Sequence, residues 1–352
     1  MAKKFGRPFA RAAGLAAAAG GAGLAIGAFA YSQLLSRKAA KRGFNQLSDE
    51  DALLGKEGAH LKKEQESLWD RLLARAMGDA AGLEDFYDKP YYPSFFDGLQ
   101  WFFAKKPEKI AIDSPRGSRI HADMILNEKP SDVWVICVHG YCSSPRDFGG
   151  AAKIYHEWGY NTLLPYLCGH GDSEDNFVSM GWLDRLDIVA WVDYLVREYG
   201  SPKIILHGVS MGAATTMMAT GEDLPANVIC AVADCGYTSV WDEYAVQARE
   251  TLHIPVSLLY ALDAVVRMKH GFSLKEASSI NQLKKSKTPT LFIHGDADDF
   301  VPFWMLELVY DACAAEKEKL VAPGAGHAEA CYQFELYYGA IRDFINRYLP
   351  EE

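Results

Sequence analysis

The chain has 352 residues and a mass of 39.0 kDa, and its 49% hydrophobic and 23% charged residues are typical of one large globular domain with an extension. The formal net charge is −10, but residues 1–42 hold eight Lys/Arg and no Asp or Glu, so the remainder carries −18. Because such an acidic body repels phosphate backbones, the composition excludes a nucleic acid partner. The seven cysteines show no C-x-x-C or metal-ligand spacing, so we expect neither a disulfide framework nor a metal site.

An uncharged run of 25 residues occupies positions 12–36 and is long enough to span a bilayer. Basic residues flank both of its ends and Tyr31 lies near one edge, which is typical of a single-pass membrane anchor. The tripeptide Ala-Phe-Ala at 28–30 also fits the cleavage site of a secretory signal peptide. Residues 1–42 are therefore expected to be an N-terminal transmembrane helix or a signal peptide. Four basic residues on each side of the run leave its orientation in the membrane open.

Residues 43–105 form the next unit of the sequence. Four leucines fall on one face of a charged, helical pattern and predict a spacer helix within 43–80: Leu61, Leu68, Leu72 and Leu73. The segment YDKPYYPSFFDGLQWFF is rich in aromatic residues and Pro, and we expect it to pack irregularly against the domain that follows. All candidate catalytic residues lie beyond position 105, so removal of residues 1–42 is expected to leave activity largely intact.

From residue 106 onward, short apolar stretches alternate with longer amphipathic ones. Period-two alternation predicts strands in KIAIDS and RIHADMILN, and the apolar stretch DVWVICVHG predicts a buried strand. Further strands are predicted in NTLLP, KIILHG, NVICAVAD, PTLFIHG and KLVAP. Because helical stretches separate most of them, residues 106–352 are expected to form an α/β domain with a mainly parallel sheet and helices on both faces. An insertion at about 237–287 holds two further helical stretches.

The segment Gly208-Val209-Ser210-Met211-Gly212 matches the G-x-S-x-G turn that lifts a serine hydroxyl above a sheet. It stands between a predicted strand and a predicted helix, as that turn requires. A serine nucleophile also needs a general base and a carboxylate that orients the base. Asp298, in HGDADDFVP, and His327, in GAGH, each follow a later predicted strand. The chain order Ser210, Asp298, His327 is one that such triads take.

Six motifs together resemble the α/β-hydrolase superfamily, particularly bacterial proteins related to its Bem46 and serine aminopeptidase-like groups. They are VHGY at 138–141, GHGDSE at 169–174, GVSMG at 208–212, DCGYTS at 234–239, HGDADDFVP at 294–302 and GAGH at 324–327. The resemblance covers about 108–349 and implies the α/β-hydrolase fold, with the insertion as a small helical cap. It also implies an oxyanion hole made by the backbone N–H groups of Tyr141 and Met211, and catalysis without a metal or organic cofactor.

The same resemblance chooses among three neighbouring carboxylates. The register His-Gly-x-x-Asp-x-x-Val-Pro assigns the acid to Asp298 rather than to Asp296 or Asp299. The chain departs from the family at 165–171, PYLCGHG, where an Asp and an Arg are usual. These two residues support loops in the family, so the departure bears on local hydrogen bonding. The histidines of the early loops, His139 and His170, are expected to be structural, as is His294.

These observations predict a membrane-tethered serine hydrolase that cleaves a small-molecule carboxylic ester, or a thioester or amide, through an acyl-enzyme. Ser210 attacks, His327 transfers the proton and Asp298 orients the imidazole. The ester is favoured by analogy with the fold, and an aminopeptidase-like amide hydrolase is an alternative. The other alternative is a non-catalytic binding module with the same fold. Three aromatic residues are candidates for a substrate-binding wall: Trp241, Phe300 and Trp304.

Overall fold

An eight-stranded sheet forms the centre of the computed structural model, which describes residues 23–32, 34–36, 49–53 and 89–349. The strands are β1 (Glu108–Asp113), β2 (Arg119–Ile125), β3 (Val133–Val138), β4 (Asn161–Pro165), β5 (Lys203–Val209), β6 (Val228–Asp234), β7 (Thr290–Gly295) and β8 (Lys317–Ala322). Their order across the sheet is β1-β2-β4-β3-β5-β6-β7-β8. β2 is antiparallel to β1 and β4, and all later pairings are parallel, which confirms the mainly parallel sheet.

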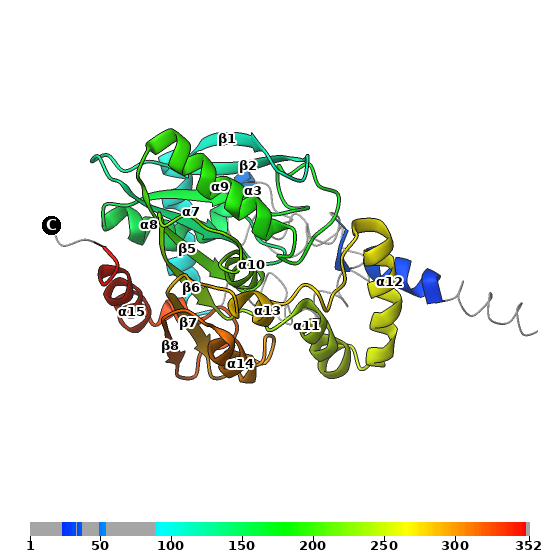
Figure 1. Ribbon diagram of the computed structural model, residues 1–352. Helices are drawn as coiled ribbons and strands as arrows, with labels where there is room; N and C mark the ends of the chain where they lie inside the picture. Colours follow the sequence, from blue (N-terminus) through cyan, green and yellow to red (C-terminus); the bar gives the residue numbers. More distant parts are fainter. Residues whose placement is uncertain (1–22, 33, 37–48, 54–88, 350–352) are drawn as a thin grey trace, which may run out of the picture.

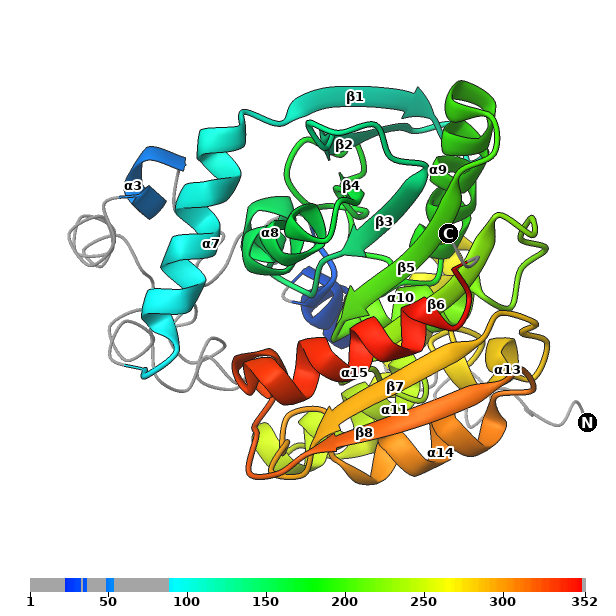
Figure 2. The same ribbon diagram turned by 90° about the vertical axis from the view of Figure 1, so that its left-hand side faces the viewer.

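Helices cover both faces of this sheet, as the alternation of elements predicts (Figures 1 and 2). α8 (Gly149–Glu157) and α15 (Phe334–Asn346) pack on one face. On the other face lie α9 (Asp184–Tyr199), α10 (Met211–Ala219) and α14 (Trp304–Ala312). The remaining α-helices are α3 (Asp49–Leu53), α7 (Tyr92–Lys105), α11 (Val240–Val246), α12 (Leu259–His270) and α13 (Ser279–Leu283). Shorter helical turns span Pro145–Phe148, Gln247–Thr251, Val256–Leu258 and Ala330–Tyr332.

Side chains that alternate along β3 divide the core into two layers. Trp134 and Ile136 belong to the layer of α9 and α10, whereas Val135 and Cys137 belong to the layer of α8 and α15. Every residue of β3 is buried, which explains its continuous apolar sequence. The chain leaves β3 through α8 and leaves the adjacent β5 through α10, on opposite faces of the sheet. In open α/β sheets such a switch point leaves a crevice at the carboxyl ends of the strands.

The aromatic-rich lead-in forms a regular helix, α7, and not the irregular segment that we expected. Pro93 lies in its first turn, where the missing N–H costs no intrahelical hydrogen bond. Gly98 lies against α8 so closely that a Cβ at this position would be 2.4 Å from the backbone nitrogen of Gly150. The contact between α7 and α8 is therefore made by backbone at glycines, with Leu99 and Phe102 of α7 also buried. The leucine face of the predicted spacer helix lies outside the described residues, and within 43–80 the structure describes only the short α3.

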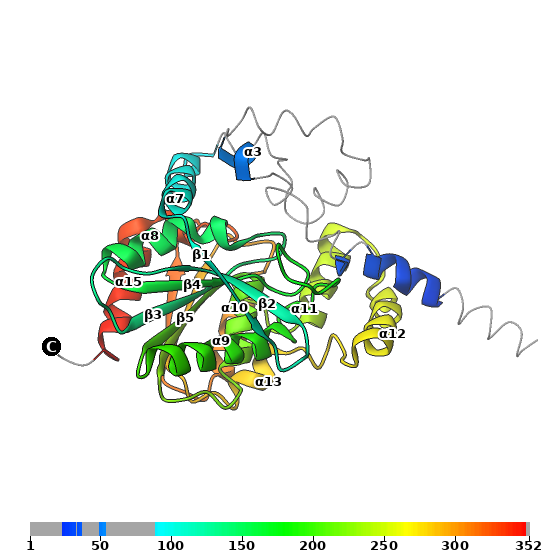
Figure 3. The ribbon, with the colours of Figure 1, turned by 90° about the horizontal axis from the view of Figure 1, so that it is seen from above.

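The insertion forms a small cap from α11 and α12, as the resemblance implies, at one end of the molecule (Figure 3). Residues 23–32 are helical and lie beside α12 (Figures 1 and 3). Tyr31 hydrogen-bonds through its hydroxyl to His270 Nε2 at 2.8 Å, and Gly27 packs on the backbone of Ala261. Within the part of the chain that the structure describes, no helix has the length and apolarity needed to cross a membrane. The transmembrane helix expected over 12–36 is thus not found there, and much of that run lies outside the described residues.

Candidate active site

Ser210 occupies a sharp turn between β5 and α10. Its backbone has φ 57° and ψ −120°. This conformation is unfavourable in free energy for any residue that has a side chain, and it persists only where the surrounding structure enforces it. Gly208 and Gly212 make the turn possible, because a Cβ at Gly208 would lie 2.1 Å from the carbonyl oxygen of Gly212. A Cβ at Gly212 would lie 1.9 Å from the carbonyl oxygen of Val138 in β3. The strained turn therefore presents the Ser210 hydroxyl at the crevice beside β3.

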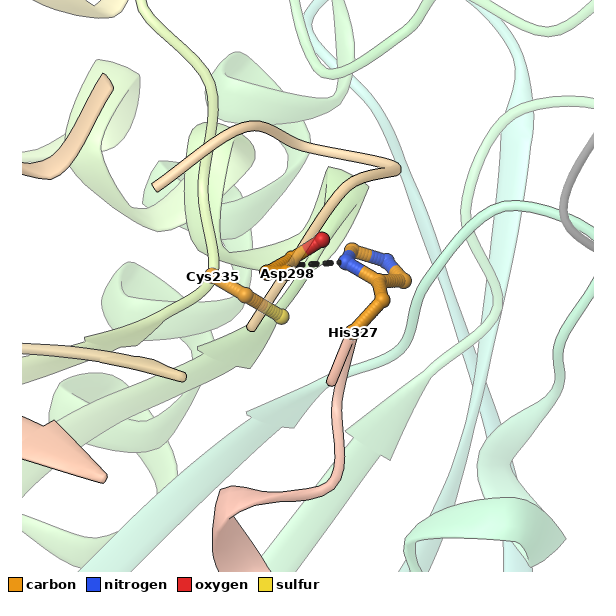
Figure 4. Close-up of side chains that lie close together, drawn as sticks. All are labelled: Cys235, Asp298 and His327. Atoms are coloured by element: carbon orange, nitrogen blue, oxygen red, sulfur yellow. Dashed lines mark hydrogen bonds and ion pairs between the residues drawn. The ribbon is translucent and has the colours of Figure 1, made fainter. Parts of the chain in front are cut away.

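A chain of hydrogen bonds connects Ser210, His327 and Asp298, which come from three loops beyond the carboxyl ends of strands. Ser210 Oγ lies 2.9 Å from His327 Nε2, and His327 Nδ1 lies 2.8 Å from Asp298 Oδ2. Figure 4 shows the imidazole of His327 facing the carboxylate of Asp298. The contact to the carboxylate places the imidazole proton on Nδ1, so Nε2 is free to accept the serine proton. The tertiary structure thus brings together all three residues that the sequence selected.

Asp298 is a buried carboxylate surrounded by donors. Besides His327, its oxygens accept from the backbone N–H groups of Phe300 and Val301, both at 3.0 Å, and His294 Nε2 lies 3.2 Å away. Burial by itself would raise the pKa of Asp298, but the charge of His327 and the hydrogen bonds of His294 and His327 lower it to about 2. Asp298 is therefore ionised at neutral pH. His294, which also donates to the carbonyl of Val301, fixes the end of this loop.

The loop that follows β3 lies directly beside the nucleophile turn. A Cβ at Gly140 would meet Ser210 Cβ at 3.5 Å, so the loop passes close to the serine and the glycine leaves open the space between them. Tyr141 is the next residue, and Met211 begins α10, where an N–H has no partner inside its own helix. These are the two residues whose backbone N–H groups the resemblance assigns to an oxyanion hole.

Two buried histidines fix this loop. His139 Nδ1 donates to the carbonyl of Gly140 at 2.8 Å, and its Nε2 accepts from the N–H of Leu167 at 3.2 Å. His170 Nε2 accepts from the N–H of Cys142 at 3.3 Å. Burial, with a smaller contribution from His170, lowers the pKa of His139 to about 3, so this ring stays neutral and keeps both contacts. The structural role expected of these histidines agrees with their hydrogen bonds.

Two cavities of unequal size meet at Ser210. The larger has a volume of about 540 Å³, and its wall includes Gly140, His327 and residues of α7 and α8. The smaller has a volume of about 20 Å³ and is enclosed by Tyr141, Met211, the cap helix α11 and the loop after Asp298. His327 lines the larger cavity and is not among the residues that line the smaller one. Ser210 therefore stands between an open chamber and a nearly filled one.

The three candidate aromatic residues do not form a common wall. Phe300 lines the small cavity, and its ring centroid lies 4.8 Å from that of His327. Trp241 packs against Tyr260 within the cap, and Trp304 is 50% exposed at the start of α14. Neither tryptophan lines either cavity at Ser210, so only Phe300 is placed to contact a substrate. Trp241 belongs to α11 and Trp304 to α14, and these helices place both residues away from the two cavities at Ser210.

A buried polar chain lies behind the site, and of its members the sequence singled out only Asp234, in the motif DCGYTS. Tyr337 Oη donates to Asp234 Oδ2 at 2.9 Å, and His207 connects Tyr337 to Tyr155 through contacts of 3.0 and 2.8 Å. Burial raises the pKa of Asp234 to about 6, although the hydrogen bond from Tyr337 lowers it. The backbone carbonyl of Asp234 accepts from the N–H of Ser210 at 2.8 Å. This chain therefore supports the turn at Ser210, and in the sequence Tyr337 resembles an ordinary core residue of a helix.

The departure at 165–171 is compensated by an arginine from another part of the chain. Arg116 lies with its Nη2 atom 3.2 Å from Cys168 Sγ, and it pairs with Asp187 at 2.6 Å and Asp175 at 3.0 Å. The side chains of all three charged residues are at least 88% buried. A guanidinium from the β1–β2 hairpin thus occupies the place beside residue 168, where the family usually has an arginine.

Among the residues that the structure describes, two groups of side chains have atoms close enough to share a metal ion: Cys235 with Asp298 and His327, and Cys168 with Asp175 and Asp187. In the first, His327 and Asp298 are already hydrogen-bonded to each other (Figure 4). Burial raises the pKa of the Cys235 thiol well above its usual range, which opposes the thiolate that a metal needs. The second group surrounds the Arg116 guanidinium, which supplies the positive charge. The chemistry of both groups favours hydrogen bonding over metal binding.

Comparison with known proteins agrees with this architecture. The prolyl oligopeptidase family matches residues 148–351. The chain is 30% identical over 250 residues to the α/β-hydrolase domain-containing protein aho-3 of Caenorhabditis elegans, covering 66% of this chain and 63% of that protein. It is 24% identical over 199 residues to the protein bem46 of Schizosaccharomyces pombe, covering 55% of this chain and 60% of bem46.

Among solved structures, the esterase Pf2001 of Pyrococcus furiosus shares the fold with a TM-score of 0.58 and 22% identity, over 71% of this chain and 94% of the esterase. The chain spans less than two thirds of aho-3 and of bem46, so their whole-protein properties do not transfer directly. The family match, by contrast, covers more than half of this chain. The chain therefore belongs to the prolyl oligopeptidase family, as a Bem46-type member of the α/β-hydrolase superfamily.

Proposed function

We propose that this protein is a serine hydrolase that cleaves a carboxylic ester through an acyl-enzyme. The observation that carries the proposal is the hydrogen-bonded chain from Ser210 through His327 to the buried, ionised Asp298. The strained turn at Ser210 adds support, because backbone strain of this kind persists where a reactive group must be held in place.

In the proposed reaction, Ser210 Oγ attacks the carbonyl carbon while His327 Nε2 takes the hydroxyl proton. The negative charge that develops on the carbonyl oxygen is stabilised by the backbone N–H groups of Tyr141 and Met211. Loss of one such donor typically costs about 10² to 10³ in kcat. The imidazolium then gives its proton to the leaving oxygen, the alcohol departs, and the acyl group stays on Ser210. Water attacks this ester by the same steps and releases the carboxylic acid.

The two cavities assign the two halves of the substrate. The leaving group must receive a proton from His327, and His327 lines only the larger cavity, so the alcohol part belongs in the chamber of about 540 Å³. The acyl part then faces the small cavity beneath the cap. The large chamber has the size of a typical small-molecule site.

An aminopeptidase-like amide hydrolase is a second candidate, and the match to the prolyl oligopeptidase family supports it. Both reactions use the same nucleophile and base and differ in the leaving group. Purified protein assayed against p-nitrophenyl esters and aminoacyl p-nitroanilides separates the two. We expect turnover of the esters at a kcat/KM that exceeds that of the anilides.

The proposal is tested most directly with a fluorophosphonate probe, which transfers its phosphonyl group to an activated serine with loss of fluoride. We expect labelling of the wild-type protein and none of Ser210→Ala, with circular dichroism showing that both are folded. An unlabelled wild-type protein, next to a labelled control hydrolase, would contradict the proposal and favour the non-catalytic binding module.

We further infer that residues 1–42 tether this hydrolase to a membrane. The inference rests on the uncharged run at 12–36 with four basic residues on each side. After sodium carbonate extraction of membranes, we expect the full chain in the pellet and a protein beginning at residue 43 in the supernatant. Release of the full chain by carbonate would overturn the tether.

A further inference from the structure

The small cavity beside Ser210 contains two polar groups for which the proposed reaction has no use. Glu243 and Tyr244, adjacent on the cap helix α11, both line it and are only 3% and 4% exposed. Glu243 Oε2 and Tyr244 Oη have no hydrogen-bond partner among the residues that the structure describes. A buried polar group without a partner costs about 1–3 kcal/mol, so two of them at one cavity indicate that the cavity receives a polar group.

The protonation of Glu243 follows from its surroundings. Gln247 Nε2 donates to Glu243 Oε1 at 2.9 Å and to the carbonyl of Phe300 at 2.8 Å, which makes Oε1 an acceptor. Burial raises the pKa of Glu243 to about 8, so the carboxyl is neutral near pH 7. Its proton then belongs on Oε2, the oxygen without a partner. Glu243 therefore offers a hydrogen-bond donor, and Tyr244 offers a hydroxyl that both donates and accepts.

The rest of the cavity limits what can bind. Its other walls include Met180, Tyr237 and Val301, and its volume of about 20 Å³ is close to that of a single water-sized group. Neutral Glu243 is a donor, so it can hydrogen-bond a neutral hydroxyl group. It matches an ammonium group less well, because an ammonium group needs only acceptors. The space excludes a long acyl chain.

We propose that this cavity is a subsite for a hydroxyl on the acyl part of the substrate, bound by Glu243 and Tyr244, so that short 2-hydroxyacyl esters are preferred. The inference rests on the proposed hydrolase function, because it needs the acyl group on Ser210. The side chain beyond the carbonyl carbon then carries one hydroxyl, which lies between the two groups. No bond is made or broken in the subsite.

Four phenyl esters test this subsite: acetate, propionate, 2-hydroxyacetate and 2-aminoacetate. Propionate carries a methyl group where 2-hydroxyacetate carries a hydroxyl group of similar size. The kcat/KM for each ester is corrected by dividing it by the rate constant for hydrolysis of the same ester by hydroxide. We expect the wild-type protein to show a corrected kcat/KM about tenfold or more higher for 2-hydroxyacetate than for propionate, since sites that hydrogen-bond a hydroxyl reject analogues without it.

Variants assign the preference to the two residues. In Glu243→Leu and in Tyr244→Phe, the ratio of the corrected kcat/KM for 2-hydroxyacetate to that for propionate should fall toward one. Tyr260 is an exposed tyrosine on α12 outside the cavity, so Tyr260→Phe should keep the wild-type ratio. The ratio is measured within each variant, so a general loss of activity does not imitate the effect. Glu243→Gln, which retains a donor and the shape of the side chain, should keep part of the preference.

Other outcomes overturn the assignment in distinguishable ways. Equal corrected rates for propionate and 2-hydroxyacetate in the wild-type protein mean that the cavity holds only a structural water. A preference for 2-aminoacetate that disappears in Glu243→Gln means that the subsite binds an ammonium group. If no ester is hydrolysed and the fluorophosphonate does not label Ser210, the proposed function itself fails.

Discussion

Asp298 differs from its two neighbouring carboxylates in burial rather than in chemistry. Its side chain is enclosed and accepts from two backbone N–H groups, whereas Asp296 and Asp299 are exposed. Asp296 accepts from the N–H of Gly324 and so holds the loop that carries His327. The sequence register chose Asp298 from the family pattern, and the donors around it give the physical reason for that choice.

We therefore predict that Asp298→Asn lowers kcat by up to about 10⁴, the loss seen when a triad acid is replaced by an amide that favours the wrong imidazole tautomer. Asp296→Asn and Asp299→Asn should retain kcat within about tenfold, because both side chains are exposed and Asn at position 296 keeps an oxygen that can accept from the N–H of Gly324. Steady-state kinetics on the three folded proteins decides the order. An inactive Asp299→Asn beside an active Asp298→Asn would place the acid elsewhere.

Glu243 makes the stability of the protein depend on pH. Its pKa is raised by burial from an ordinary value of 4.5 to about 8, despite the hydrogen bond from Gln247. Between these values the unfolded chain releases a proton that the folded chain keeps, so the free energy of unfolding decreases as pH rises from about 4.5 to 8. We predict that Glu243→Gln, which has no proton to lose, gains stability relative to the wild-type protein over this window.

Urea unfolding at several pH values across that window measures the difference. The exposed Glu198→Gln serves as the control and should follow the wild-type curve. A difference between Glu243→Gln and wild type that stays constant with pH would show that Glu243 ionises as readily in the folded state as in the unfolded state.

At the scale of elements, α7 shows where reading the sequence was insufficient. Strands β3 and β5 are evident from their apolar runs, and the cap helices from their periodicity. α7 instead packs through the backbone of Gly98 against Gly149 and Gly150 of α8. A glycine in a helix reads as a weak point in sequence, because only the neighbouring helix reveals that a side chain there would clash.

Two glycine-to-alanine substitutions test this packing. Gly98→Ala places a methyl group within 2.5 Å of Gly150 backbone atoms and should destabilise the protein by about 1–3 kcal/mol through overpacking. Gly150→Ala meets nothing within 4 Å and lies in α8, so it should be neutral or stabilise by up to about 1 kcal/mol. Urea unfolding of both variants gives the comparison. Equal effects would mean that α7 does not approach α8 as closely as described.

At the scale of the whole molecule, the N-terminal segment is connected to the active site. Leu35 is buried, its carbonyl accepts from the N–H of Val178 at 2.6 Å, and Tyr141 Oη donates to the carbonyl of Leu34 at 2.8 Å. Tyr31 reaches the cap at His270. The side chain of Tyr141, whose backbone N–H is assigned to the oxyanion hole, is therefore held by the N-terminal segment. The sequence alone had indicated that this segment is a separable anchor.

This contact changes what a truncation should do. A protein that begins at residue 43 loses Leu34 and Leu35, and we predict a kcat/KM for a p-nitrophenyl ester about tenfold or more below that of the full chain, since small displacements of catalytic groups cost rate steeply. A protein that begins at residue 23 keeps these contacts and should retain the activity. If both truncated proteins equal the full chain, measured in the same detergent, the segment is separable after all.

The sequence by itself determined the mainly parallel sheet, the cap and the choice of Ser210, Asp298 and His327. The sheet and Ser210 follow from local patterns, which are apolar periodicity and glycines at a turn, whereas the cap and the choice of Asp298 follow from the resemblance to the α/β-hydrolase superfamily. Only the tertiary structure decided which aromatic residue meets the site, which arginine stands beside Cys168, and that Glu243 Oε2 lies at the small cavity beside Ser210 with no hydrogen-bond partner among the described residues. All three findings depend on distances between elements far apart in the chain, because burial and hydrogen-bond satisfaction are properties of packed neighbours and not of sequence spacing.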